Sequence, residues 1–262
     1  MEYSGITKTC IPLIGEVGQY IRTEAARFDY HVVEEKGRND LVSYVDKRAE
    51  EMLVRGLQDI LPEAGFITEE GTATHRQEKF RWVIDPLDGT TNFTHGLPVY
   101  AISVALLAGE ELVAGMVYEI NKEEMFWATK GGGAWLGDKR IYVSGREKLA
   151  ESLLATGFPY YNFDRMEAYL RILNDFMQVT HGLRRIGSAA VDLAYVACGR
   201  FEGFFEYNLN AWDVAAGSLL VSEAGGRVTD FRLGNNFLFG KEIIAGGQVL
   251  PAMQQVIAQH WL

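Results

Sequence analysis

Asp85-Pro86-Leu87-Asp88-Gly89-Thr90-Thr91-Asn92-Phe93 places two carboxylates three residues apart, directly after an apolar run and directly before a Gly-Thr pair. The preceding residues 80–84 are mostly β-branched and aromatic, as in a buried strand. We therefore expect both carboxylates at the carboxyl end of a strand, where open α/β sheets bind their ligands. Hard carboxylate oxygens suit Mg²⁺, which usually binds through one or two carboxylates and substrate phosphate oxygens.

The second part of this stretch has the chemistry of an anion site. Pro86 lacks a backbone donor, and Gly89 permits a sharp turn and the close approach of an anion. The amides of residues 89–91 would then face one oxyanion at a helix start, where the helix dipole favours negative charge. A surface turn followed by an N-capped helix is the alternative, because Asp, Gly and Thr are ordinary residues in both.

Length and composition describe an ordinary globular chain. Its 262 residues allow a large core, in one two-lobed domain or two small domains, and 48% of them are hydrophobic. With 25 basic and 35 acidic side chains, the net charge is −10, which opposes non-specific binding to nucleic acid or anionic lipid. An anionic substrate would need local positive charge, which bound metal cations provide.

Other sequence features narrow the class of protein. Cys10 and Cys198 are too few and too far apart for a disulfide framework or a structural zinc site, so we expect reduced, buried thiols. The N-terminus lacks a secretory pattern, and no apolar run reaches the roughly 18 residues of a membrane helix, so a cytoplasmic protein is expected. The histidines lack metal-ligand spacing, and Ser188 lacks a nucleophile-elbow pattern.

Hydrophobic periodicity predicts a mixed order of helices and strands. Residues 46–61 are expected to form an amphipathic helix, and an earlier helix around 11–21 must hold Pro12 in its first turn or kink there. Strands at 99–107, 111–120 and 123–129 suggest an antiparallel meander. Residues 131–133, all glycine, permit a tight connection, whereas a nucleotide loop would require a following helix. Further expected elements are a strand at 153–155, helices at 165–177 and 188–198, a strand at 201–207, and a helix at 212–224 ended by two glycines.

Three further acidic residues have both a functional and a structural interpretation. Glu69 lies between a predicted strand end and a polar turn, where a solvated carboxylate is the alternative. Asp213 begins a helix of small residues beside Trp212, and a plain helix N-terminal Asp is its alternative. Glu206 lies in an apolar strand and needs a partner, which sugar or inositol hydroxyls could provide; a strand-edge carboxylate facing water is its alternative.

Glu69, the nonamer at Asp85 and the segment 212–226, with Trp212-Asp-Val-Ala-Ala-Gly followed by Glu223-Ala-Gly-Gly, together resemble the inositol monophosphatase family of Mg²⁺-dependent, lithium-sensitive phosphatases. The resemblance covers essentially the whole chain. It implies an α+β fold, a layered αβαβα sandwich of the inositol monophosphatase and fructose-1,6-bisphosphatase type. It also implies a single catalytic domain over 1–262, with lobes of about 1–145 and 146–262, assembled as a homodimer with two to three Mg²⁺ ions per site.

The resemblance assigns metal ligands by position. Glu69, Asp85 and the carbonyl of Leu87 correspond to ligands of the first metal, and Asp85, Asp88 and Asp213 to ligands of the second, with Glu69 also near a third. Two divalent cations can clamp the attacking and leaving oxygens of an in-line phosphoryl displacement.

The resemblance also assigns catalytic and substrate-binding residues. Thr90 and Glu69 orient and deprotonate the attacking water, and Asp46 supports Thr90, although a simple helix cap is the alternative for Asp46. The substrate contacts that it implies are Leu87, Asp88, Gly89, Thr90, Gly187, Ser188, Ala189, Glu206 and Asp213. Phe158 stands where animal enzymes have a small hydroxyl residue, a departure that weakens strict inositol specificity, although a Thr-Gly-Phe-Pro run is typical of bacterial members.

The expected function is hydrolysis of inositol 1-phosphate or a related sugar or polyol phosphate by metal-activated water. Fructose 1,6-bisphosphatase activity is the nearest alternative, followed by hydrolysis of 3′-phosphoadenosine 5′-phosphate or histidinol phosphate. A non-catalytic binding or regulatory protein is the alternative from a different class. The net charge of −10 and the set of metal ligands that the resemblance implies speak against it, and no nucleic-acid or membrane partner is expected.

Overall fold

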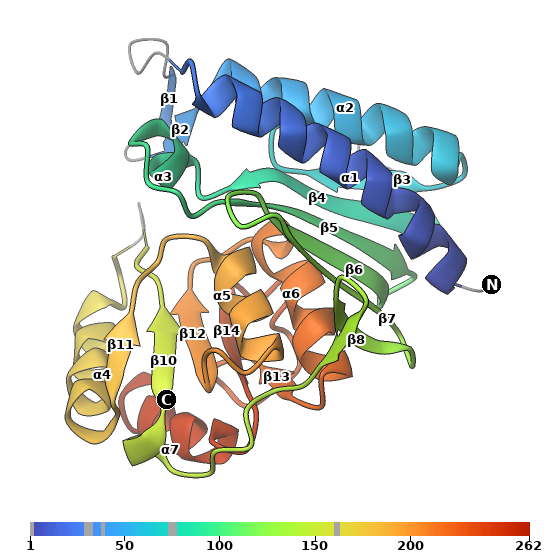
Figure 1. The fold of residues 1–262 in the computed structure, drawn as a ribbon. Coiled ribbons are helices and arrows are strands. Elements are labelled where there is room, and N and C mark those ends of the chain that lie inside the picture. The colour runs from blue at the N-terminus through green and yellow to red at the C-terminus, as the bar shows by residue number, and fades with distance from the viewer. Residues whose placement is uncertain (1–2, 29–33, 38–39, 73–77, 160–162) are drawn as a thin grey trace.

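The computed structural model describes residues 3–28, 34–37, 40–72, 78–159 and 163–262. Its two main sheets and its helices form five alternating layers (Figure 1). The helices are α1 (Tyr3–Ala25), α2 (Tyr44–Ile60), α3 (Thr90–Thr94), α4 (Met166–Val179), α5 (Ala189–Ala197), α6 (Ala211–Glu223) and α7 (Leu250–Trp261), with a 3₁₀ turn at Leu149–Glu151. The layered αβαβα architecture expected from the resemblance is therefore confirmed.

The first main sheet has seven strands in sequence order. They are β3 (Gly65–Thr68), β4 (Phe80–Asp88), β5 (Ala101–Ala108), β6 (Glu111–Glu119), β7 (Glu124–Thr129), β8 (Gly133–Leu136) and β9 (Lys139–Ile141). Only the β3–β4 pair is parallel among these. β5 to β7 form the predicted antiparallel meander, and β8 and β9 extend it. Residues 131–133 make the tight connection between β7 and β8.

The second main sheet has five strands and a mixed order. Its order is β11 (Gly182–Arg184), β10 (Leu153–Thr156), β12 (Gly203–Tyr207), β14 (Glu242–Gly246) and β13 (Arg227–Thr229). β10 is parallel to both of its neighbours, whereas β14 is antiparallel to both of its own. A small hairpin of β1 (Glu34–Gly37) and β2 (Asp40–Val42) lies apart from both sheets.

Three apolar clusters hold the layers together. One packs α1 and α2 against one face of the first sheet, and a second packs α4 and α7 against the second sheet. The third fills the middle of the molecule, where α5 and α6 separate the two sheets. Because apolar surface covers both sides of this middle layer, all nine residues of α5 are buried.

Two alternatives were open for Pro12, a place in the first turn of the helix or a kink, and the structure excludes the first turn. Pro12 lies in the interior of α1, nine residues after its first residue, and not in the first turn. The long apolar face of α1, including Cys10, Ile14 and Val17, packs into the core and compensates for the backbone hydrogen bond that proline cannot donate.

Two smaller expectations concern the thiols and the membrane. Cys10 and Cys198 are both free, with Cys10 buried and Cys198 only partly so. Burial raises the pKa of the Cys10 thiol to about 12, so this thiol stays protonated. None of the helices in the described part of the chain has the length and apolar character needed to span a membrane.

Candidate active site

Strand β4 carries both carboxylates of the nonamer on one face because of a bulge. Asp85 pairs with Ser103 of β5, but Asp88 pairs with Ala101, so three steps along β4 match two along β5. In a regular strand, residues three apart point to opposite faces, and one extra residue cancels that difference. Leu87 accordingly points to the α1–α2 side, whereas Asp85 and Asp88 share the side of α5 and α6. Pro86 lies within the bulge.

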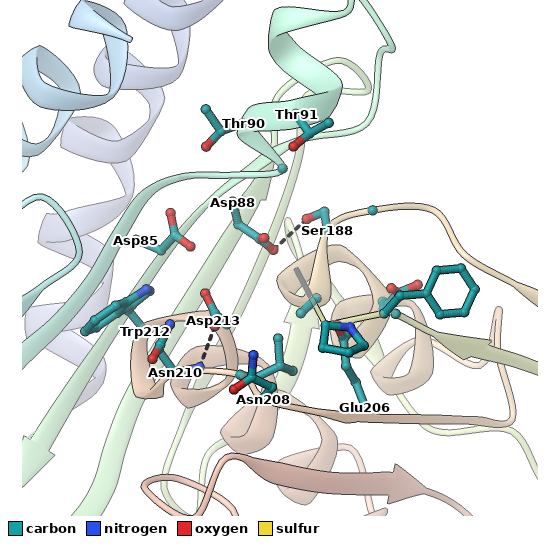
Figure 2. A pocket seen from close by; sticks show the side chains of 18 of the residues that line it. Asp85, Asp88, Thr90, Thr91, Ser188, Glu206, Asn208, Asn210, Trp212 and Asp213 are labelled. Atoms are coloured by element: carbon teal, nitrogen blue, oxygen red, sulfur yellow. Dashed lines mark hydrogen bonds between the residues drawn. The ribbon is translucent and has the colours of Figure 1, made fainter. Parts of the chain in front are cut away.

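Asp213 joins these two carboxylates from α6. One oxygen of each of Asp85, Asp88 and Asp213 lies within 4.8 Å of one oxygen of the others. Figure 2 shows the three side chains turned toward one common space, below Thr90 and Thr91. The Asn210 amide donates to Asp213 Oδ2 at 2.6 Å, so Asp213 also caps the start of α6. The two interpretations of Asp213 from sequence, a site residue and a helix N-terminal Asp, are therefore compatible.

The hydroxyl of Thr90 connects this acidic group to α2. Thr90 Oγ1 donates to Asp46 Oδ1 or to the Leu87 carbonyl, each at 3.1 Å. The other oxygen, Asp46 Oδ2, accepts from the Ser43 amide at 2.9 Å and from the Ser43 hydroxyl at 2.6 Å. Asp46 therefore caps a helix and contacts Thr90 at once. Gly89, just before Thr90, has φ +97°, and a Cβ there would lie 3.1 Å from the Val99 carbonyl.

Residues from the second half of the chain close the site. The Ser188 hydroxyl and the Ala190 amide donate to Asp88 Oδ2 at 2.7 and 2.6 Å, which joins the start of α5 to the end of β4. Asn92 of α3 donates to the Ile186 carbonyl at 2.7 Å, a second link between the two halves. The site is thus assembled from both sheets and from the helices between them.

These residues line one cavity with a volume of about 350 Å³. The sequence-predicted residues among its walls are Glu69, Asp85, Leu87, Asp88, Gly89, Thr90, Gly187, Ser188, Ala189, Glu206 and Asp213. Asp46 lies outside the lining and reaches the site through Thr90. Phe158 also lines the cavity, and 42% of its surface is exposed.

The position of Glu206 decides between its two interpretations. It lies on β12, a central strand between β10 and β14, and only 7% of its surface is exposed. The interpretation of Glu206 as a strand-edge carboxylate facing water is therefore wrong. Figure 2 places it in the same pocket as Asp88 and Ser188.

Burial and mutual repulsion raise the pKa values of the acidic group. Burial raises the pKa of Asp88 to about 6, although hydrogen bonds from Ser188 and Ala190 oppose the rise. Burial, then repulsion from Asp88, raises the pKa of Asp213 to about 7. Burial raises the pKa of Asp85 well above its usual value, and repulsion from Glu69 adds to this effect. The site therefore concentrates negative charge that a cation would relieve.

The donor set fits a hard divalent cation. The carboxylates offer only oxygen ligands, as Mg²⁺ requires, and rigid elements hold them close together. The Leu87 carbonyl accepts from Thr90, but a carbonyl oxygen has a second lone pair. Glu69 lies outside the group of three and lines the same cavity, where its charge acts on Asp85.

Two charged residues of the cavity were missed in the sequence. Asp192 of α5 and Arg185 both line it. Burial, then repulsion from Glu206, raises the pKa of Asp192, and the charge of Arg185 opposes that rise. A single acid within the apolar run Ala189–Ala197 is the same signal that drew attention to Glu206.

Comparisons with known proteins agree with this site. The sequence profile of the inositol monophosphatase family matches residues 2–261. The putative Nus factor SuhB of Neisseria meningitidis is 44% identical over 93% of this chain and 94% of its own. The inositol-1-monophosphatase of Mesorhizobium japonicum is 43% identical over 82% and 81%.

The solved structures show the same fold. The crystal structure of the extragenic suppressor protein SuhB from Bartonella henselae superposes with a TM-score of 0.91 at 38% identity, covering 97% of this chain and 98% of that one. The profile match and these relatives all span most of the sequence. This chain therefore belongs to the inositol monophosphatase family.

Proposed function

We propose that this protein is a Mg²⁺-dependent phosphomonoesterase that hydrolyses inositol 1-phosphate or a related polyol or sugar phosphate. The observation that carries the proposal is the group Asp85, Asp88 and Asp213, which lines a cavity with Glu206 in its wall. When bound, divalent cations would neutralise phosphate charge and make the attacking water more acidic. Asp85, Asp88 and Asp213 would hold them, with Glu69 and the Leu87 carbonyl as further ligands.

The chain's own residues then perform three tasks. Thr90, fixed by its hydrogen bond to Asp46, accepts a hydrogen bond from the attacking water and orients it. Glu69, in the wall of the same cavity, accepts the proton that the water loses. The backbone amides of Gly89 and Thr90 bind a phosphate oxygen, since the first amides of a helix have no partner within that helix.

The alcohol side of the substrate meets different residues. Glu206 and the segment from Gly187 to Ala189 contact the departing alcohol, which leaves with a proton from solvent. The Ser188 hydroxyl also donates to Asp88, so a hydrogen bond connects the residues that contact the alcohol to the acidic group. No covalent enzyme intermediate is required, because water attacks phosphorus directly.

A substrate panel at one Mg²⁺ concentration tests this function. Phosphate release is measured from inositol 1-phosphate, fructose 1,6-bisphosphate, 3′-phosphoadenosine 5′-phosphate and histidinol phosphate, each with and without chelator and with lithium. We expect the fastest release from inositol 1-phosphate, with inhibition by both chelator and lithium. Release that persists in chelator would contradict the proposal.

A second candidate function comes from the names of the relatives. Proteins named as Nus factor SuhB and as inositol-1-monophosphatase are nearly equally similar to this chain, at 44% and 43% identity. Similarity therefore does not choose between a Nus factor role and phosphatase activity. Complementation of a gene deletion with Asp88→Asn separates them: rescue would support the non-catalytic role, and failure with folded protein supports catalysis.

We also propose a cytoplasmic homodimer that needs no nucleic-acid or membrane partner for turnover. The support is the family resemblance together with the net charge of −10. Light scattering of the purified protein should give twice the mass of one chain. Cell fractionation should place the activity in the cytoplasmic fraction.

A further inference from the structure

Asp192 is a buried acid that the proposed chemistry does not use. It lies on the apolar helix α5, is only 1% exposed, and lines the cavity. Its Oδ1 atom is buried and has no hydrogen-bond partner among the residues that the structure describes. An unsatisfied buried polar atom is unfavourable, so a buried acid is expected to have a ligand or partner that satisfies it.

Glu206 lines the same cavity from the second sheet. Its place on the central strand β12 gives it a rigid base. Gly157 leaves room for its carboxylate, because a Cβ at Gly157 would lie 2.1 Å from both Glu206 oxygens. Repulsion from Glu206 acts on Asp192, so the two carboxyl groups are electrostatic neighbours. The cavity therefore has two further acids beside the group at Asp85, and repulsion from Asp88 reaches both of them.

We propose that Asp192 is a specificity-determining residue that, with Glu206, accepts hydrogen bonds from hydroxyl groups of the departing alcohol. This inference rests on the proposed phosphatase function and deepens it. The preferred substrate is then the monophosphate of an uncharged alcohol with several hydroxyl groups. Each hydroxyl can donate to a carboxylate oxygen, which satisfies the buried Asp192 Oδ1 only when such a substrate binds.

The same pair acts against two other substrate classes. A second phosphate on the alcohol would be repelled by two carboxylates, so bisphosphates are disfavoured. An alcohol that carries an ammonium group gains less binding energy, because Arg185 already supplies a cation in this cavity, and its charge opposes the rise in the pKa of both acids. Neutral hydroxyl groups on the alcohol are therefore the donors that best match Asp192 and Glu206.

The test compares substrates with and without hydroxyl groups on the leaving side. Wild type, Asp192→Ala and Asp192→Asn are assayed with inositol 1-phosphate, p-nitrophenyl phosphate and fructose 1,6-bisphosphate at saturating Mg²⁺. For Asp192→Ala we expect kcat/KM on inositol 1-phosphate to fall by about 10- to 100-fold, mainly through KM. The fall on p-nitrophenyl phosphate, which has no hydroxyl groups, should be several times smaller.

Asp192→Asn keeps the shape and one acceptor but removes the charge. It should recover most of the inositol 1-phosphate activity and raise the rate on fructose 1,6-bisphosphate relative to wild type. This variant also keeps the inference testable if Asp192→Ala does not fold.

Ser218→Ala is the matched control. Ser218 of α6 is equally buried, and no partner for its hydroxyl is found within the described parts of the chain, but it lies outside the cavity lining. Its substitution should change none of the three kcat/KM values. Equal losses on all substrates in Asp192→Ala would overturn the inference and leave the phosphatase function standing. No phosphate release by wild type from any substrate would instead overturn the proposed function.

Discussion

Asp46 uses its two carboxylate oxygens for two different parts of the structure. Oδ2 closes the start of α2 through Ser43, and Oδ1 accepts from Thr90. The two interpretations of this residue from sequence, a helix cap and a support for Thr90, are therefore compatible. A carboxylate has about four acceptor positions, so one interaction does not exclude the other.

At Asp88, substitution by asparagine should separate catalysis from folding. The asparagine side chain keeps an oxygen that can accept from Ser188 and Ala190, but the change removes one negative charge from the metal-binding group. We expect turnover to fall by at least about 100-fold, as for loss of a metal ligand. The melting temperature in chelator should stay equal or rise. The control is Asp138→Asn in the exposed turn between β8 and β9, and a similar loss of turnover there would contradict the assignment.

At the scale of elements, Glu50 of α2 positions the loop that carries Glu69. Glu50 is fully buried, and it accepts from the Glu70 amide at 2.8 Å and from the Thr72 amide and hydroxyl at 2.9 and 2.7 Å. Glu50→Ala should therefore lower kcat by about 10- to 100-fold with a smaller change in KM, a size typical of lost support for a site residue.

Hydrogen exchange distinguishes this positioning role from general destabilisation. In Glu50→Ala, the amides of residues 70 and 72 should exchange faster, while the interior of α2 keeps its protection. Glu51→Ala is the matched control, since Glu51 is the next residue, is exposed, and pairs only with Arg48 at 2.8 Å among the interactions described. Faster exchange throughout α2 would indicate a structural role instead.

The packing of α5 against α6 depends on Gly217. A Cβ at Gly217 would lie 2.4 Å from the Cβ of Leu193, which cannot move without shifting α5. Gly217→Ala should lower the free energy of unfolding by about 1–3 kcal/mol, as overpacking does elsewhere. Gly15→Ala in α1 is the control, because a Cβ at Gly15 would have no described atom within 4 Å. Denaturant unfolding should show Gly15→Ala equal to or more stable than wild type, by up to about 1 kcal/mol.

Most long elements could be predicted from the sequence, and the short strands could not. The apolar spacing in α2 extends over several periods, and the apolar runs of β5 and β6 are long and bounded by turn residues, so the type of these elements is clear. β11 and β13 have three residues each, which is too short for a period of two to be recognised. Their strand geometry comes from hydrogen bonds to β10 and β14, which are tertiary contacts.

For a similar reason, some residues of the candidate site could be predicted from the sequence and others could not. Asp85, Asp88 and Asp213 occur in long motifs, and the structure brings them together. Asp192 has no motif, and its importance depends on a cavity formed by both sheets. The burial of Glu206 depends on the position of β12 in the sheet order, which sequence alone does not reveal.

For the whole molecule, the acidic group links stability to pH. Because burial raises the pKa of Asp88 from 3.8 to about 6, its stabilising contribution is complete below the unfolded value and is lost as the pH rises through about 6. The pKa of Asp213, about 7, extends this loss to higher pH. For Asp88 alone, the difference corresponds to about 3 kcal/mol. The metal-free protein should therefore become less stable between about pH 4 and pH 7.

Unfolding by urea in chelator measures this effect. The free energy of unfolding of Asp88→Asn should fall less steeply over that pH range than that of wild type. Added Mg²⁺ should reduce the fall in wild type, because cations bind the ionised carboxylates of the folded state. Parallel curves for the two proteins in chelator would show that Asp88 does not carry the raised pKa.

The bulge in β4 makes chain length as important as residue identity at this point. Asp85 and Asp88 share a face only because one residue at the bulge is left out of the pairing with β5. Without the bulge, the same three-residue spacing would turn one carboxylate to the far side of the sheet, although every ligand would still be encoded. One residue inserted between positions 85 and 88, with the bulge kept, would have the same effect, so an insertion there is expected to be tolerated less than a substitution at Pro86. The site therefore depends on the number of residues between the two carboxylates as well as on their identity.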